Sequence, residues 1–276
     1  MSAQLGHDGG HRIGSGLIDV TVPNAARATD YLNGGQINFA ADRKAAAALV
    51  ESAPSIAAFP ATARAFRHRV VRYLAADAGI RQFLDVGGGL VALGHTHGSV
   101  QAIDPSCRVV YVESDPMMLD RTQATLASAP EGLVACVEGD IADVNGIVAA
   151  AGGGAILDAT QPIAVLLLST LAHVASADDA AKVVAALMDS APSGSYLAIH
   201  HLASDLDPPL GGALKQWNAA ATVPIVLRSA DEIAALVTGL DLVPPGLVPI
   251  ADWRPEEADP PAQAPIAIYG LVARKP

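Results

Sequence analysis

Short apolar runs alternate with segments of helical periodicity between residues 81 and 201. Apolar runs bounded by turn residues are typical of buried strands, and longer segments with apolar residues about every three to four positions are typical of helices. Strands are predicted over 81–87, 108–114, 133–140, 162–169 and 195–201, with helices near 95–103, over 116–127, near 144–151 and over about 178–190. Strands separated by helices pair in parallel and are covered on both faces. The pattern therefore predicts an α/β fold around a mostly parallel sheet.

The end of the chain departs from this alternation. The SADE motif at 229–232 is a capping box, which predicts a helix over 232–239. A short strand over 240–243 and a final strand within 264–275 follow, and no helix fits into the Pro-rich loop between them. Because parallel strands need a long crossover, we expect these two strands to pair antiparallel. The DPP motif at 207–209 is interpreted as loop punctuation.

The segment before the sheet has helical character. In residues 61–79, Phe66, Val70, Val71 and Leu74 recur at helical spacing before Gly79 ends the run. Residues 1–22 are rich in Gly, His and Ser without periodicity and predict a flexible tail. We therefore expect a tail over 1–22, a helical cover over 23–80 and a ligand-binding domain over 81–276.

Charge and composition narrow the class of partner. The 276-residue chain carries a formal net charge of −11, which repels nucleic acid and anionic lipid, so neither is expected as a partner. The longest apolar stretch, 162–175, is shorter than the roughly 20 residues of a membrane helix. The two cysteines and the absence of a secretion signal favour a cytoplasmic protein. His95 and His97 have no further ligand near them in the sequence, so no metal is expected.

A glycine turn follows the first predicted strand. Gly87, Gly88 and Gly89 begin a G-x-G-x-x-A pattern that is typical of nucleotide binding, because bare backbone can approach the ligand. Asp85 precedes the turn, and its carboxylate would repel the pyrophosphate of a dinucleotide but attract an ammonium group. S-adenosylmethionine carries an ammonium and a sulfonium and has no phosphate, so the turn favours it.

Two further acids end the next two predicted strands, Glu113 in the second and Asp140 in the third. The carboxyl ends of parallel strands line one crevice, where ligands bind open α/β folds. Asp85, Glu113 and Asp140 are therefore expected to lie around one ligand.

Six stretches, in order along the chain, resemble an actinobacterial family of S-adenosylmethionine-dependent methyltransferases long catalogued as a domain of unknown function. They cover residues 26–43, 73–90, 108–119, 162–174, 193–201 and 228–255. The resemblance implies the class I methyltransferase fold, a Rossmann-like, mostly parallel seven-stranded sheet whose last strand is inserted antiparallel. It also implies S-adenosylmethionine as the cofactor.

The resemblance also assigns site residues. Asp85, Gly87 and Gly89 would hold the methionine and ribose portions, Glu113 the ribose hydroxyls and Asp140 the adenine amine. The remaining residues of the expected cofactor site are Gly88, Ser114, Pro116, Met117, Ile141, Ser169, Tyr31 and Asn38. Tyr31 and Asn38 lie in the first matching stretch and are interpreted as a lid over the cofactor or acceptor.

Histidines near two strand ends are candidate bases. His173 follows the fourth predicted strand, and His200 and His201 end the fifth. Side chains alternate along a strand, so one of the adjacent histidines should face the crevice. We expect His201 to do so, because it matches a position of the family pattern. His201, His173 and Tyr31 are therefore the candidate catalytic residues. Trp217 and Trp253 are interpreted as packing residues.

The sequence as a whole predicts a methyltransferase that acts on a small-molecule acceptor, for which secondary metabolism is one fitting setting. Two alternatives stay open at this point: a non-catalytic protein that binds S-adenosylmethionine or S-adenosylhomocysteine, and an NAD-dependent oxidoreductase. Homo-oligomer formation is equally open.

Overall fold

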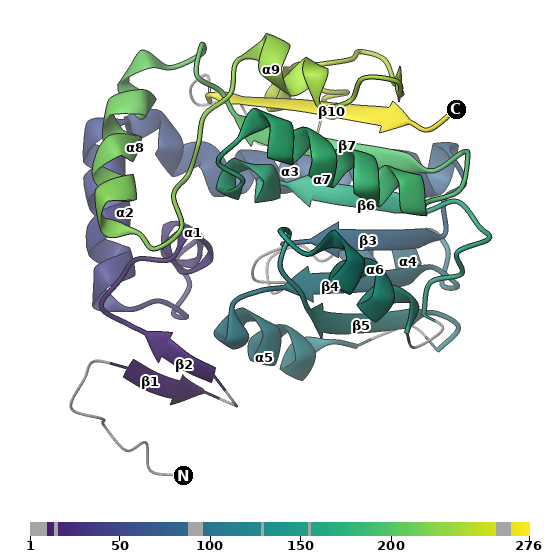
Figure 1. The fold of residues 1–276 in the computed structure, drawn as a ribbon, viewed down its shortest axis with the longest axis horizontal. Helices are drawn as coiled ribbons and strands as arrows, with labels where there is room; N and C mark the ends of the chain where they lie inside the picture. The colour runs from purple at the N-terminus through teal and green to yellow at the C-terminus, as the bar shows by residue number, and fades with distance from the viewer. Residues whose placement is uncertain (1–9, 14–15, 88–95, 128–129, 154–155, 258–265) are drawn as a thin grey trace.

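A computed structural model describes residues 10–13, 16–87, 96–127, 130–153, 156–257 and 266–276. One large sheet lies between two layers of helices, and further helices gather at one end of its strands (Figure 1). The strand order is β5-β4-β3-β6-β7-β10-β8, with β9 also pairing with β10. The strands are β3 (Gln82–Val86), β4 (Arg108–Glu113), β5 (Leu133–Glu138), β6 (Ala164–Leu168), β7 (Tyr196–Leu202), β8 (Asp241–Leu242), β9 (Val248–Pro249) and β10 (Ile268–Arg274).

The pairing confirms the predicted α/β architecture. Strands β3 to β7 run parallel to their neighbours, whereas β10 pairs antiparallel with β7, β8 and β9. The final strand is thus inserted antiparallel, as expected. In register, Asp85 lies beside Tyr111, and Leu168 lies beside His200. The carboxyl ends of the parallel strands therefore meet at one edge of the sheet.

Alternation along the strands separates two buried layers. Phe83 packs with residues of α3 (Phe59–Arg72), whereas Leu84 and Val86 pack with residues of α6 (Val144–Gly152) and α7 (Ala177–Ser190). Asp85 shares the parity of Phe83 and therefore lies on the α3 face. Helices α4 (Thr96–Gln101) and α5 (Pro116–Thr125) complete the crossovers.

Helices α1 (Ala25–Leu32), α2 (Ala40–Ser52) and α8 (Pro208–Ala220) lie beyond the carboxyl ends of the parallel strands (Figure 1). Asn24 caps α1 by accepting from the backbone N–H groups of Ala26 and Arg27. Arg27 and Asp42 form a buried ion pair of 3.0 Å that joins α1 to α2. Deeper in the molecule, the guanidinium of Arg69 on α3 donates to the backbone oxygens of Ile250 and Trp253. These contacts fix the helical cover over one end of the sheet.

Two elements differ from the sequence-based expectation. The segment predicted as a flexible tail contains a hairpin of β1 (Gly10–Ile13) and β2 (Gly16–Asp19), and Ile18 packs against Met117 and Met118 of α5. The DPP motif begins helix α8 instead of punctuating a loop. Proline is well tolerated in the first turn of a helix, since the N–H groups there have no partner within the helix. Helix α9 (Ala230–Ala235) begins at the predicted capping box.

Across the described part of the chain, the helices are all too short or too polar to cross a membrane.

Candidate functional site

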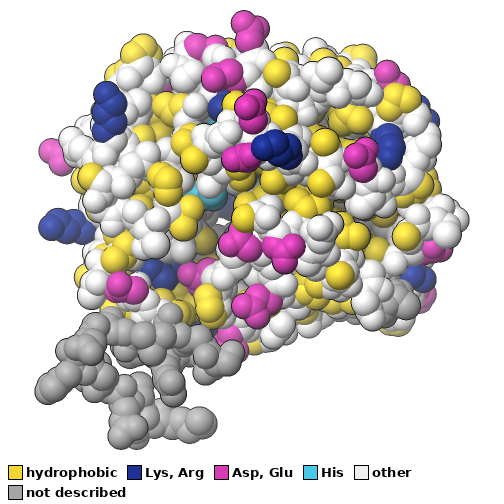
Figure 2. Space-filling view, viewed as in Figure 1, with side chains coloured by type: hydrophobic (Ala, Val, Ile, Leu, Met, Phe, Trp, Pro, Cys, Tyr) yellow, Lys and Arg dark blue, Asp and Glu magenta, His cyan; other side chains and the backbone are white. Residues whose placement is uncertain are grey.

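A cavity of about 660 Å³ lies at the carboxyl ends of the parallel strands, between the sheet and the helical cover. Figure 2 shows the hollow, with a histidine side chain visible inside it and acidic side chains gathered beside it. The ends of β3, β4, β5, β6 and β7 all contribute lining residues, as do α1, α2, α3 and α8. The predicted crevice is therefore present, and it is roofed by helices.

Gly87 forms the turn after β3 and lines the cavity. Its φ of +68° is in the left-handed region, which favours glycine. A Cβ at this position would lie 2.9 Å from Oγ1 of Thr170, and that hydroxyl donates to the backbone oxygen of Val86. Both the backbone angle and the close approach therefore require glycine. Gly88 and Gly89, also predicted to hold the cofactor, lie outside the described residues.

Asp85 is fully buried behind the cavity wall and does not itself line the cavity. Its Oδ2 accepts hydrogen bonds from Nη1 of Arg67 (3.0 Å) and from Oγ1 of Thr96 (2.7 Å). Its Oδ1 is buried without a hydrogen-bond partner among the described residues. Asp85 is thus not an isolated negative charge, because it pairs with Arg67, a residue that does line the cavity.

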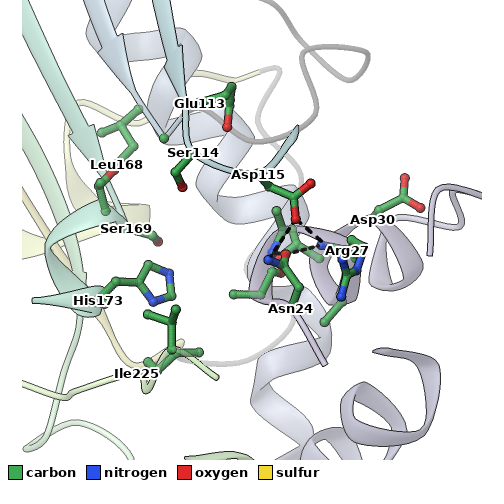
Figure 3. A pocket seen from close by; sticks show the side chains of 18 of the residues that line it. Asn24, Arg27, Asp30, Glu113, Ser114, Asp115, Leu168, Ser169, His173 and Ile225 are labelled. Atoms are coloured by element: carbon green, nitrogen blue, oxygen red, sulfur yellow. Dashed lines mark hydrogen bonds and ion pairs between the residues drawn. The ribbon is translucent and has the colours of Figure 1, made fainter. Parts of the chain in front are cut away.

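Glu113 ends β4 and lines the cavity, with an exposed fraction of 4%. Ser114 follows it at the cavity surface, and Figure 3 shows both side chains at one side of the pocket. Pro116, the first residue of α5, also lines the cavity. Met117 does not, because it packs against Ile18 of the hairpin. Of these three residues, Ser114 and Pro116 therefore line the cavity and Met117 does not.

Asp140 and Ile141 follow β5 and line the same cavity. Asp140 is exposed, and its Oδ1 accepts from the backbone N–H of Ala142 at 2.9 Å. The three acids of successive strands are therefore arranged in depth, with Asp85 buried behind the wall, Glu113 in the wall and Asp140 near the surface.

Ser169 follows β6 with a φ of +74°, a strained angle for a residue other than glycine. Its Oγ lies 3.1 Å from Nδ1 of His200, and its N–H donates to the backbone oxygen of His200 at 3.0 Å. These contacts hold the Ser169 side chain at the cavity wall, where Figure 3 shows it beside His173.

The orientation expected for the adjacent histidines is corrected by the structure. His200 lines the cavity between the rings of Phe59 and Phe66, whereas His201 is fully buried on the other face. Nη1 of Arg228 donates to Nε2 of His201 at 2.6 Å, so Nδ1 of His201 carries the proton and donates to the backbone oxygen of Leu202 at 2.8 Å. His201 therefore packs away from the crevice.

Desolvation lowers the pKa of both histidines, to about 3 for His200 and to about 4 for His201. The positive charge of Arg67 further disfavours the protonated form of His200. At neutral pH the two imidazoles are uncharged.

His173, in the short 3₁₀ segment Thr170–His173, lines the cavity as the sequence predicted. Its side chain points toward the same space as Ser169 and Ser114 (Figure 3). Desolvation lowers the pKa of His173 below its usual 6.5. Its Nδ1 lies 3.4 Å from the backbone oxygen of Pro224, which can only accept, so this long contact favours the tautomer with Nε2 unprotonated. His173 is thus a neutral imidazole able to accept a proton.

Tyr31 and Asn38 do not line the cavity. Tyr31 is 37% exposed on α1, and Nδ2 of Asn38 donates to Oδ2 of Asp30 at 2.7 Å. Asn24 and Arg27, at the start of the cover, line the cavity instead (Figure 3). Asp30 also lines it, but its carboxylate accepts from the backbone N–H of Ile37 and from Asn38. A lid over the cavity, and any role of Tyr31 and Asn38 in it, stays a prediction.

Asp115 connects the start of α1 to the start of α5. Its Oδ2 lies 3.2 Å from Nδ2 of Asn24, which donates to it, and 3.5 Å from Nη1 of Arg27. Its Oδ1 accepts from the first N–H groups of α5. Asn24 could be recognised from the sequence as a helix N-cap, because asparagine is a preferred residue there. Its contact with Asp115 could not, because Asp115 lies 91 residues further along the chain.

Part of the cavity lining is apolar and includes residues that the sequence did not single out. Ile56, Phe59, Leu214 and Ile225 line the cavity, and Figure 3 shows Ile225 beside His173. Trp217 on α8, interpreted from the sequence as a packing residue, also lines the cavity. Trp253 packs against Phe66 and Tyr73, as interpreted. Among the residues described, no three His, Cys, Asp or Glu side chains are grouped so that they could hold a metal ion.

The parallel sheet, its antiparallel final strand and the glycine turn above an acidic strand end define the class I methyltransferase fold. An O-methyltransferase family protein from Burkholderia thailandensis shares that fold, with 18% identity over 75% of this chain and 55% of that chain and a TM-score of 0.52. A likeness at this level shows the fold alone.

The model of the S-adenosyl methyltransferase family matches residues 12–276, so the chain belongs to this family. It is an S-adenosylmethionine-dependent methyltransferase, and S-adenosylmethionine is its cofactor. A DUF574 family protein from Streptomyces avermitilis is 37% identical, with a TM-score of 0.89 over 94% of this chain and 99% of that chain. A protein from Thermobifida fusca, assigned provisionally as a methyltransferase, is 33% identical, with a TM-score of 0.85 over 93% and 96%. No curated protein matches the sequence.

Proposed function

We propose that the protein transfers the methyl group of S-adenosylmethionine to a small molecule bound in the same cavity. The observation that carries this proposal is the enclosure of the strand ends within a cavity of about 660 Å³. This volume lies within the range of small-molecule sites. A nucleic acid acceptor is disfavoured by the net charge of −11. A role in secondary metabolism and the oligomeric state stay predictions from the sequence.

Several described residues fit the chemical groups of the cofactor. Glu113 suits the ribose hydroxyls, and Asp140 suits the adenine amine. The Asp85–Arg67 pair combines a negative and a positive group, which complements the ammonium and carboxylate of an amino acid. Oδ1 of Asp85 has no hydrogen-bond partner among the described residues, so an ammonium group that reached it behind the cavity wall would satisfy it.

The cofactor supplies a methyl group that its sulfonium already activates. The protein must therefore align the acceptor atom and exclude water, and a base is needed only where that atom carries a proton. His173 can accept this proton, because burial keeps its imidazole neutral at physiological pH. The mainly apolar wall formed by Phe59 and Trp217 excludes water from the same space.

A labelled-methyl assay tests the acceptor class. Protein incubated with methyl-labelled S-adenosylmethionine and a cell extract is expected to pass label to the low-molecular-mass fraction, and not to protein or nucleic acid. Label in a macromolecular fraction would contradict the proposal. Tight cofactor binding in calorimetry with no labelled product in any fraction would favour the alternative of a non-catalytic cofactor-binding protein.

Replacement of Glu113 by alanine is expected to weaken binding of S-adenosylhomocysteine by about 1–3 kcal/mol, because charge-assisted hydrogen bonds to the ribose are lost. Isothermal calorimetry measures the change. Glu138→Ala is the matched control: Glu138 pairs in register with Glu113 on β5 but is exposed and does not line the cavity. Equal affinities of the two variants would show that Glu113 does not bind the ribose hydroxyls.

A further inference from the structure

The two sides of the cavity differ in chemical character. Arg67, Glu113 and Asp140 lie where the cofactor is expected. Figure 3 shows His173 beside Ile225, across the pocket from Asn24, Arg27 and Asp115. Arg64 on α3 also lines the cavity, and its Nη2 donates to Oδ1 of Asn33 at the C-terminal end of α1. The side chains that Figure 3 labels next to His173 are those of Leu168, Ser169 and Ile225, and none of these three carries a charge.

We infer that the methyl acceptor is an uncharged, mainly apolar molecule with a phenol-type hydroxyl, and that His173 takes the proton of this hydroxyl. The inference rests on the proposed function and specifies its substrate class. Phe59, Leu214 and Trp217 form the apolar surface that such a molecule would cover.

The acid–base properties of amines, alcohols and phenols favour a phenol as the group that is methylated. An aliphatic amine is protonated at neutral pH, and its ammonium would enter this apolar side without a carboxylate partner, which is costly. An aliphatic alcohol is far too weak an acid for an imidazole to deprotonate effectively. A phenol ionises near pH 10, as tyrosine does, so a neutral imidazole can assist its ionisation during methyl transfer.

The transfer step balances without a further reactant. An electron pair of the phenol oxygen forms the new O–CH₃ bond, while the C–S⁺ bond breaks and its electron pair stays on sulfur. The products are a methyl ether and S-adenosylhomocysteine. The hydroxyl proton passes to Nε2 of His173, whose Nδ1 faces the backbone oxygen of Pro224. His173 is only partly buried, so the proton can then leave to solvent.

The titratable groups packed around His173 do not change their charge near neutral pH, so His173 is the base on its side of the cavity. The strand packed against its segment carries His200 and His201, both neutral above about pH 5 because burial lowers each pKa, to about 3 and about 4. The nearby guanidinium of Arg228 donates to the backbone oxygens of Leu171 and Val174 and stays protonated. Neither strand histidine nor Arg228 changes its charge between about pH 6 and pH 9.

Four naphthalene probes test the substrate class: naphthol, naphthylmethanol, naphthylmethylamine and hydroxynaphthoate. They share one ring system but present a neutral phenol, a neutral alcohol, a cation and a phenol with an added anion. Label from S-adenosylmethionine is expected to pass to naphthol at least about tenfold faster than to each other probe. Faster transfer to any other probe, or transfer to none of the four, overturns the inference. Cofactor binding in calorimetry and label transfer to the extract are measured in parallel and report on the proposed function separately.

The role of His173 is tested by the pH profile of naphthol methylation. The wild-type rate is expected to be level between about pH 7 and pH 9, because His173 is already deprotonated there. His173→Gln is expected to lower the rate about 10²-fold and to make it rise about tenfold per pH unit, because naphthol must then ionise without a base. His68→Gln, which changes an exposed histidine of α3 outside the cavity, is expected to keep the wild-type profile. A level profile in His173→Gln would exclude His173 as the base.

Discussion

Replacement of Asp85 by alanine is expected to lower the free energy of unfolding by about 3 kcal/mol and to weaken binding of S-adenosylhomocysteine. Removing one partner of a buried ion pair takes away a charge that stabilises the other, and Asp85 is fully buried beside Arg67. We take the lower end of the usual range because the Arg67 side chain is 17% exposed, so solvent screens part of its charge. Denaturant unfolding measures the first effect and calorimetry the second.

Asp104→Ala is the control for this prediction. Asp104 also pairs with an arginine, at 2.6 Å from Nε of Arg81, but both side chains are partly exposed and lie far from the cavity. Its replacement is expected to change stability little and to leave ligand affinity unchanged. The double variant with Arg67→Ala is expected to regain part of the stability lost in Asp85→Ala, because it also removes the charge that Asp85 opposes. If the double variant were less stable by the full sum, the pair would not act as a unit.

Replacement of Gly87 by alanine is expected to cost about 2–4 kcal/mol of folding free energy. An alanine at φ +68° is strained by about 1–2 kcal/mol, and its Cβ would press on the Thr170 hydroxyl 2.9 Å away. Thr170 cannot easily rotate away, since it is β-branched and bonded to Val86. Unfolding by urea measures the cost.

Gly79→Ala separates the two contributions. Gly79 has a φ of +71°, but a Cβ added there would meet no neighbouring atom within 4 Å, so only the backbone strain applies. The difference between the two variants is the cost of the Thr170 contact. Equal costs would mean that Thr170 gives way freely and that the turn tolerates a side chain. Cofactor affinity should fall in Gly87→Ala alone, because only Gly87 lines the cavity.

The sheet could be predicted from the sequence because its signals are local. Buried strands are continuous apolar runs, and the antiparallel pairing of β10 with β8 followed from the missing helix between them. The pairing of β1 with β2 was missed because Ile18 packs against Met117 and Met118, about a hundred residues further along the chain. Helix α8 was missed because Pro208 and Pro209 also occur in turns, and only the following packing distinguishes the two.

Site residues could be predicted from the sequence where their position along a strand determines that they reach the cavity. Glu113 and Asp140 stand at strand ends, and their place in the cavity follows from parallel pairing. The choice between His200 and His201 depends on which sheet face carries α3, and the local pattern does not contain this information. Arg67 was missed for a similar reason: its contact with Asp85 requires the packing of α3 on the sheet.

A crystal structure of the protein with S-adenosylhomocysteine would show where each part of the cofactor lies. We expect ribose hydroxyls within hydrogen-bond distance of Glu113, the amino acid end next to Asp85 and Arg67, and the sulfur facing the side of the cavity where His173 lies. A sulfur that faces away from His173, or a nucleoside bound outside this cavity, would contradict this expectation.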